Sequence, residues 1–396
     1  MLSAEVHAVR RLMLTDFRCY ESVQLNIDSR PVVLTGPNGA GKTNLLEAVS
    51  FLVPGRGLRG ARLTEISRRS PAERLSDDQR LRPWAVAARI ENGSKLVNVG
   101  TGLSPDTADL QALRPRRVVR IDGAASRGQA ALGEIVAALW LTPDMQRLFV
   151  DGASGRRRFL DRLVFAFDPA HAGRLQGYEK AMRDRSRVLG DADTDGRAPD
   201  GTWLDAVEAT IVEKGVAITA ARADLVRRLN PACAMGVGPF PAAGLAVSGE
   251  IDDWLAHMSA LDAEDNFSTA LAGSRDRGSQ ARRVPVGPHM SDFDVTHLDK
   301  NVAAALCSTG EQKALLISIV LANARLQALD VGAVPLLLLD EVAAHLDEAR
   351  REALFEEIAA MGAQAWMTGT DPALFAPLGS AAQHFAVADA LITPSS

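Results

Sequence analysis

The sequence predicts an α/β fold, a mixed sheet with flanking helices, into which a largely helical lobe is inserted. Strand and helix patterns alternate near both ends of the 396-residue chain, whereas the middle has mainly helical spacing. The two ends therefore read as halves of one α/β head. We expect three segments: 1–155, the first part of the head with a β-rich subregion; 156–285, the inserted lobe; and 286–396, the second part of the head.

The N-terminal segment predicts strands over 9–17, 22–27 and 31–35, because these runs are rich in Val, Ile and Leu and have polar residues or Pro between them. A helical spacing of apolar residues follows over 44–53. Between 84 and 122, short alternating segments are separated by Asn-Gly and Asp-Gly, which favours antiparallel hairpins.

The middle of the chain predicts helices over 156–167, 174–189 and 202–230, with a polar break between the last two and an end before Pro231. Two such helices form a helical hairpin. The sequence has no sustained heptad run, so we do not expect a long coiled-coil arm. Gly and Pro interrupt the region from 235 to 300. Beyond it the pattern is helix 311–329, strand 334–339, helix 347–360 and strand 364–368.

Composition limits the possible partners. The net charge of −5 gives no global attraction to nucleic acid, so contacts with DNA must come from local arginine clusters. Cys19, Cys233 and Cys307 have unrelated spacings, which favours reduced thiols over a disulfide framework or a zinc site. No apolar run is long enough for a signal sequence or a membrane span, so we expect a cytoplasmic protein without a membrane partner.

The segment GPNGAGKT fits the phosphate-loop pattern G-x-x-x-x-G-K-T and lies between a predicted strand and a predicted helix. Its backbone N–H groups and the helix N-terminus would face the phosphates of ATP. Lys42 would reach the β and γ oxygens, and the Thr43 hydroxyl would ligate Mg²⁺. The expected nucleotide contacts are Gly36, Pro37, Asn38, Gly39, Ala40, Gly41, Lys42 and Thr43.

A second motif, PLLLLDE, ends in Asp340 and Glu341. Four consecutive leucines indicate a strand buried on both faces, and ligands bind at the carboxyl edge of such sheets. Asp340 would share the Mg²⁺ with Thr43, and Glu341 would act as general base toward the attacking water. The expected catalytic residues are Lys42, Asp340 and Glu341. The carboxylate pair favours an ATP hydrolase over a small GTPase, which orients water with a glutamine.

A third motif, CSTGEQK, begins at Cys307. Ser308 is a good N-cap for the helix that follows, and Gly310 permits close approach of a ligand. The N-terminus of that helix carries partial positive charge and attracts anions.

The sequence S-T-G-E-Q-K resembles the signature motif of ABC and SMC ATPases, and LLLLDEVAAHLDEARR resembles their acidic strand and D-loop, with Asp347 at the D-loop position. Thr43 and Ser308 are 265 positions apart (308 − 43), too far for a transporter ATPase subunit and too near for a long-armed chromosome protein. Together with RLMLTDFRCYES, LTPDMQRLFVDGASGRRRFLDRLVF and VGPHMSDFDV, this spacing resembles the RecF family of bacterial DNA replication and repair ATPases.

The resemblance implies an ABC-type head that dimerises on ATP, in which Ser308, Gly310 and Asp347 of one copy complete the nucleotide site of the other. It also implies slow, switch-like, DNA-stimulated hydrolysis on duplex or gapped DNA. The partners it implies are RecO- and RecR-type mediators and the RecA recombinase, in DNA damage repair, replication and the SOS response.

The chain departs from the family pattern at a few positions. Met290 and Ser291 stand where a basic and an acidic residue are frequent, and Trp140 stands near the expected glutamine of the Q-loop. Thr368 and Thr370 occupy the place of a transporter's switch histidine. No histidine is therefore expected to sense the γ-phosphate, and His289 and His345 are expected to be structural.

Two arginine clusters could neutralise DNA phosphates: Arg56, Arg59 and Arg62 after the phosphate-loop helix, and Arg156, Arg157 and Arg158 at a predicted helix start. A solvated charged face remains the alternative for each. With only two tyrosines in the chain, duplex backbone is a better target than stacked bases. Two other functions stay open: a transporter ATPase subunit and a non-catalytic, nucleotide-dependent scaffold.

Overall fold

The structure, a computed structural model, describes residues 7–69, 82–104, 115–126, 128–195, 200–275 and 284–395. The chain divides into two units. Unit 1 comprises Met1–Gln146, Gly236–Pro241 and Ser308–Ser396, and unit 2 comprises Arg147–Met235 and Ala242–Cys307. The boundaries expected near 156 and 285 thus fall inside unit 2 and not at its ends.

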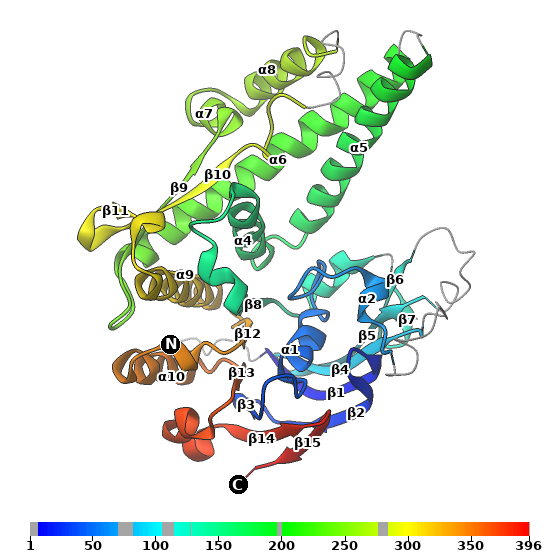
Figure 1. Ribbon diagram of the computed structural model, residues 1–396. Coiled ribbons are helices and arrows are strands. Elements are labelled where there is room, and N and C mark those ends of the chain that lie inside the picture. The colour runs from blue at the N-terminus through cyan, green and yellow to red at the C-terminus, as the bar shows by residue number, and fades with distance from the viewer. Residues whose placement is uncertain are drawn as a thin grey trace. The chain divides into compact units, whose positions relative to one another are not determined.

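A six-stranded mixed sheet of unit 1 has the order β15-β14-β3-β13-β12-β8 (Figure 1). Its five parallel strands are β3 (Val32–Thr35), β8 (Ala138–Leu141), β12 (Leu336–Leu339), β13 (Ala365–Gly369) and β14 (Gln383–Ala388). β15 (Leu391–Pro394) pairs antiparallel with β14. Parallel strands end at one edge, so the carboxyl ends of β3, β13 and β12 meet there.

A second, antiparallel sheet of unit 1 has the order β2-β1-β4-β5-β6-β7. Its strands are β1 (His7–Phe17), β2 (Tyr20–Asn26), β4 (Ala85–Asn92), β5 (Lys95–Leu103), β6 (Arg117–Ile121) and β7 (Ala124–Ala125). The hairpins expected at Asn-Gly and Asp-Gly are therefore confirmed as the β4–β5 and β6–β7 pairs. Both sheets contribute to one apolar core, in which Phe17, Phe51 and Trp84 pack with ring centroids 5.2–6.0 Å apart.

The helices of unit 1 begin within or after the sequence motifs. α1 (Lys42–Ser50) follows β3, and α2 (Leu63–Ile66) comes shortly afterward. α9 (Thr309–Asp330) is buried over most of its length, and α10 (Glu348–Met361) follows β12. Short 3₁₀ turns are η2 (Gln129–Glu134), η3 (Pro143–Arg147), η7 (Ala343–His345) and η8 (Pro372–Ala381).

Unit 2 consists mainly of helices: α4 (Ala153–Phe165), α5 (His171–Asp195), α6 (Gly201–Ala234), α7 (Glu250–His257) and α8 (Ala260–Ala272). α5 and α6 form the expected hairpin (Figure 1). A small antiparallel sheet has the order β11 (Val302–Ala303), β10 (Asp292–His297), β9 (Ala243–Ser248). Two 3₁₀ turns, η5 (Leu298–Lys300) and η6 (Ala304–Leu306), complete the unit.

Two predicted helix ends in unit 2 are wrong. α5 continues to Asp195, into the segment expected to be a polar break. α6 continues through Pro231 to Ala234. A proline removes one backbone donor, but here it lies in the last turn of a 34-residue helix, where Leu229 and Cys233 remain buried one turn apart. Packing of that face outweighs the missing hydrogen bond.

Among the described residues, no helix has the length and apolarity needed to span a bilayer.

Candidate nucleotide site

The phosphate loop lies between β3 and α1, as the sequence predicts. Gly36 has φ +151°, and a Cβ at this position would lie 2.0 Å from the backbone oxygen of Val387 in β14. At Gly41 (φ +115°), a Cβ would lie 2.6 Å from the Tyr20 hydroxyl oxygen. That hydroxyl donates to the Gly41 carbonyl at 3.1 Å. Glycine is therefore required at both ends of the loop, because backbone or ring atoms press against it.

Lys42 lies within the curve of the loop. Its Nζ donates to the carbonyl oxygens of Gly36 (2.8 Å) and Pro37 (2.9 Å). Burial lowers the pKa of Lys42, and the nearby carboxylates of Glu341 and Asp340 oppose this shift. The ammonium group is thus held where the loop's own carbonyls converge.

The two expected Mg²⁺ ligands meet, although they are 297 positions apart in the chain. The Thr43 hydroxyl donates to Asp340 Oδ1 at 3.0 Å. The same oxygen accepts a hydrogen bond of 2.7 Å from the Thr368 hydroxyl. Burial raises the pKa of Asp340, while the bonds from Thr368 and Thr43 favour the ionised form. Parallel pairing of β3, β13 and β12 produces this convergence.

Glu341 follows directly and has a left-handed backbone, with φ +53°. Its N–H donates to the Thr368 hydroxyl oxygen at 2.9 Å. For a residue other than glycine this conformation costs about 1–2 kcal/mol. The surrounding bonds therefore hold the expected general base in a strained turn beside Asp340.

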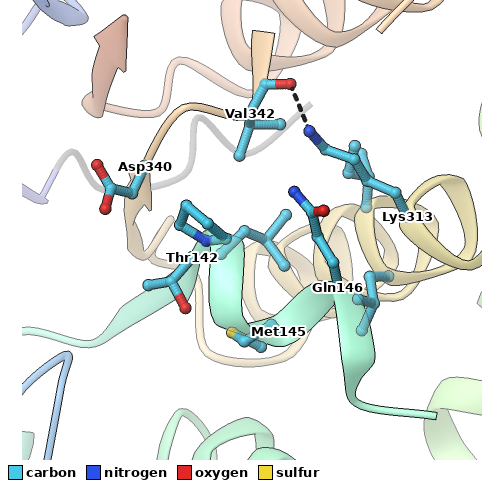
Figure 2. A pocket seen from close by; sticks show the side chains of 10 residues that line it. Thr142, Met145, Gln146, Lys313, Asp340 and Val342 are labelled. Atoms are coloured by element: carbon cyan, nitrogen blue, oxygen red, sulfur yellow. Dashed lines mark hydrogen bonds between the residues drawn. The ribbon is translucent and has the colours of Figure 1, made fainter. Parts of the chain in front are cut away.

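A pocket lies beside Asp340 (Figure 2), with this residue on one side and Gln146 and Lys313 on the other. Lys313 Nζ donates to the Val342 carbonyl at 3.0 Å. Burial lowers the pKa of Lys313 to about 8, against the opposing effect of Glu341. The remaining lining residues include Thr142 and Met145.

Gln146 is a site residue that sequence reasoning missed. Trp140, near which a Q-loop glutamine was sought, lies inside the buried strand β8 and opposite Leu338 of β12. Gln146 lies in η3, just after β8, and lines the pocket with Asp340. The apolar run Ala138–Leu141 could have indicated Gln146. If this run is recognised as a strand parallel to β12, the residues that follow it lie near Asp340.

The signature-motif residues lie at exposed helix starts. Ser308 caps α9: its Oγ accepts from the Glu311 N–H at 3.4 Å, while a Glu311 carboxylate oxygen accepts from the Ser308 N–H at 3.0 Å. Asp347 caps α10 by accepting from the Arg350 N–H at 2.8 Å. Gly310 has open space where a Cβ would lie. In the part of the chain that the structure describes, none of Ser308, Gly310 and Asp347 hydrogen-bonds to residues 36–43.

In the first arginine cluster, Arg59 has hydrogen-bond partners within the chain. Arg56 and Arg62 are exposed. Arg59 is exposed as well, but its guanidinium group donates to Asn44 Oδ1 (2.9 Å) and Glu47 Oε2 (3.2 Å) on α1. The Glu47 side chain is fully buried and also receives two bonds, of 2.7 and 2.8 Å, from Arg18.

In the second cluster, two of the three arginines have partners within unit 2. Arg156 makes two 2.7 Å bonds to the carboxylate of Asp292. Arg157 donates to the Ser291 carbonyl at 2.7 Å, and burial lowers its pKa. Only Arg158 of the three is exposed. Most of this run therefore stabilises unit 2.

The two histidines, and the residues at which the chain differs from the family pattern, differ in their burial and contacts. His289 Nδ1 lies 2.8 Å from the Tyr178 hydroxyl, and burial lowers the pKa of this histidine. The His345 side chain lies outside the described residues. Met290 is exposed, Ser291 is buried and donates to Asp252, and Thr370 is exposed, whereas Thr368 is buried.

Several known proteins are similar to this chain over almost its whole length. Residues 8–378 match the family described as RecF/RecN/SMC N terminal domain. The chain is 46% identical over 388 residues to the DNA replication and repair protein RecF of Allorhizobium ampelinum, covering 98% of each chain. It is 45% identical over 396 residues to that of Mesorhizobium japonicum, covering 100% of this chain and 99% of the relative.

Two solved structures share the fold. One is of the recombination mediator protein RecF-ATPrS in the RecFOR pathway, with a TM-score of 0.81 at 18% identity and 100% coverage of both chains. The other is the Smc head domain with a coiled coil and joint from Pyrococcus yayanosii, with a TM-score of 0.53 at 12% identity, covering 98% and 97%. The predicted ABC-type α/β head is therefore confirmed.

Proposed function

The chain belongs to the RecF family of DNA replication and repair proteins, and on this premise we propose that bound ATP joins two copies of it on DNA. Hydrolysis then releases them. The contact between Thr43 and Asp340 carries the proposal, because it brings together the two residues that a nucleotide-bound cation requires.

The residues at this contact fit Mg²⁺. A hydroxyl and a carboxylate oxygen 3.0 Å apart are hard oxygen ligands. When bound, Mg²⁺ neutralises charge that develops on the phosphate oxygens. Lys42 exchanges the carbonyls of Gly36 and Pro37 for phosphate oxygens, and the loop N–H groups bind the same anion. Glu341 accepts a proton from the attacking water, and Gln146 helps to orient that water.

The proposed site is composite. Ser308 and Gly310 lie exposed at the N-terminus of α9, and Asp347 lies exposed at that of α10. The helix dipole at the N-terminus of α9 favours an anion. Since these residues have no hydrogen bond to the chain's own loop among the described residues, we assign them to the nucleotide of a second copy.

DNA would be bound through phosphates by Arg56, Arg62 and Arg158, three exposed arginines of the two clusters. Arg59, Arg156 and Arg157 have carboxylate or carbonyl partners within the chain, so their contribution to DNA binding is smaller. The preferred DNA is duplex or gapped duplex. We further propose that RecO- and RecR-type mediators act with the protein to load RecA at gaps, in the cytoplasm and within the SOS response.

Trapping the dimer tests this proposal. Glu341→Gln removes the base while keeping the side chain's shape, so with saturating ATP and Mg²⁺ we expect sedimentation velocity to show a dimer, and with ADP a monomer. Adding Ser308→Arg as a control should abolish the dimer, because the large cation occupies the trans contact. A Glu341→Gln protein that stays monomeric at saturating ATP and Mg²⁺ would refute the composite site.

A separate measurement tests DNA binding. The triple variant Arg56→Ala, Arg62→Ala, Arg158→Ala should bind duplex DNA more weakly and with a smaller salt slope, by roughly 0.9 for each DNA phosphate that the variant no longer neutralises. Arg183→Ala, at an arginine of α5 whose side chain is 67% exposed, is the matched control. An unchanged salt slope in the triple variant would remove these arginines from the interface.

The transporter alternative is not retained, because similarity to RecF extends over 98% of the chain. A non-catalytic scaffold is distinguished by measuring phosphate release with and without gapped duplex DNA. We expect weak release that DNA stimulates; a complete absence of release would favour the scaffold.

A further inference from the structure

Thr368 lies at the end of β13, between the strands that lead to the two nucleotide motifs. In the sheet, Thr368 is opposite Leu34 of β3, and its neighbour Met367 is opposite Leu339 of β12. The residue is buried, with 1% of its surface exposed. Sequence reasoning noted it only as part of a segment that lacks a switch histidine.

A single hydroxyl at this position serves both acidic residues. It donates to Asp340 Oδ1 (2.7 Å) and accepts from the Glu341 N–H (2.9 Å). A hydroxyl has one proton to donate, so these two bonds define its direction. A chain of bonds results, from the Glu341 N–H through Thr368 to Asp340 Oδ1, where the Thr43 hydroxyl also donates.

The same strand end also contacts the phosphate loop. The carbonyl of Gly369 accepts from the Gly36 N–H at 3.3 Å. Two adjacent residues of β13 therefore bond to the first residue of the loop and to both acids. This arrangement fixes the distance between the loop and the acidic strand end.

The bond to Glu341 lies where the backbone is strained. Glu341 has φ +53°, a conformation that a non-glycine residue keeps only when its surroundings enforce it. Without an acceptor for its N–H, this turn would lack one of the hydrogen bonds that hold it. The Thr368 hydroxyl therefore compensates part of the strain.

We propose that Thr368 is a positioning residue for ATP hydrolysis, whose hydroxyl turns the Asp340 carboxylate toward Thr43 and holds the backbone that carries Glu341. This inference rests on the proposed function, since it concerns the Mg²⁺ ligands and the base of that reaction. Thr368 acts through its two neighbours and not on the reacting atoms.

Three variants isolate the hydroxyl. Thr368→Val keeps the β-branched shape and removes both hydrogen bonds, whereas Thr368→Ser keeps the hydroxyl. Thr219→Val is the matched control, because Thr219 is also fully buried and its hydroxyl donates to the Gly215 carbonyl within α6, away from the acidic strand end. Binding of the fluorescent analogue mant-ATP is measured in a Mg²⁺ titration and in EDTA, and phosphate release is followed over the same Mg²⁺ range.

For Thr368→Val we expect the Mg²⁺ concentration at half-saturation to rise about 10- to 100-fold, as when other partners of metal ligands are removed. Affinity in EDTA should stay within about twofold of the wild type, because the valine does not alter the phosphate loop itself. Turnover at saturating Mg²⁺ should fall at least about tenfold, because Glu341 loses its backbone support. Thr368→Ser should stay within about threefold throughout, and Thr219→Val should be unchanged.

A wild-type Mg²⁺ half-saturation in Thr368→Val would overturn the proposal, as would an equal loss of affinity in Mg²⁺ and in EDTA, which indicates general disruption. If the melting curve shows that the valine variant is unfolded, Thr368→Ala replaces it with the same criteria. If the wild type itself binds mant-ATP equally with Mg²⁺ and with EDTA, the proposed Mg²⁺ site fails, and the failure is not that of Thr368.

Discussion

Glu47 should be one of the most sensitive positions of the phosphate-loop helix. Its side chain is fully buried and binds two arginines: Arg18 through bonds of 2.7 and 2.8 Å, and Arg59 through one of 3.2 Å. Glu47→Ala removes the shared anion and leaves both guanidinium groups without it. Breaking a buried pair costs about 3–5 kcal/mol.

The expected cost lies at the low end because the arginine side chains reach solvent, with 18% of Arg18 and 39% of Arg59 exposed. We expect the free energy of unfolding to fall by about 3 kcal/mol, well above the roughly 0–1 kcal/mol of surface pairs. For a domain the size of unit 1, this lowers the melting temperature by roughly 6–12 °C.

Urea titration followed by circular dichroism measures this change in the free energy of unfolding. Comparison with Arg59→Ala and with the double variant Glu47→Ala, Arg59→Ala gives the part that is due to the contact between Glu47 and Arg59. We expect Arg59→Ala alone to cost much less than Glu47→Ala, because Arg18 keeps its bidentate contact. A loss below about 0.5 kcal/mol in Glu47→Ala would refute the assigned role, since surface substitutions typically have effects of that size.

Further predictions concern the loop and the pocket. Gly36→Ala should abolish ATP binding in calorimetry, because its methyl group would lie 2.0 Å from the Val387 carbonyl oxygen; Gly128→Ala, in open space, should bind normally. Tyr20→Phe should destabilise the protein by about 1 kcal/mol, measured by urea titration, and weaken nucleotide binding, since the Gly41 carbonyl loses its donor. Lys313 has a pKa lowered from 10.5 to about 8, so between these values the unfolded chain binds a proton that the folded chain lacks, and stability should rise with pH over that window. Melting temperatures measured across this pH window should rise in the wild type and not in Lys313→Met. An equal dependence of melting temperature on pH in both proteins would contradict the lowered pKa of Lys313.

The motifs with local chemistry could be predicted from the sequence, whereas long-range pairings could not. The strand, loop and helix around Lys42 follow from glycine spacing and apolar periodicity, and four leucines identify the strand before Asp340. β14 gave no such signal, because its place beside β3 depends on pairing across the chain, as between Ala386 and Thr35. That pairing decides what Gly36 contacts.

The residues of the nucleotide site could also be predicted only in part. Thr43 and Asp340 were expected to share a cation, and the structure brings them together. Gln146 was missed because β8 is a four-residue strand whose neighbour lies almost 200 positions later in the sequence. Arg156 and Arg157 stand in a basic run, yet their partners Asp292 and Ser291 come from a region for which no helix or strand was predicted.

The carbonyl of Val387 that presses on Gly36 has a consequence for biosynthesis. The phosphate loop leaves the ribosome before the strand that forms its floor, because Gly36 precedes Val387 by 351 positions (387 − 36). Gln364 likewise bonds to Val9, 355 positions away. Unit 2 is complete at Cys307 and can fold before β14 is translated, whereas the β3–β14 pair must await β14 itself. A chain cut short by a premature stop codon before β14 would carry the whole GPNGAGKT motif without the strand that shapes it.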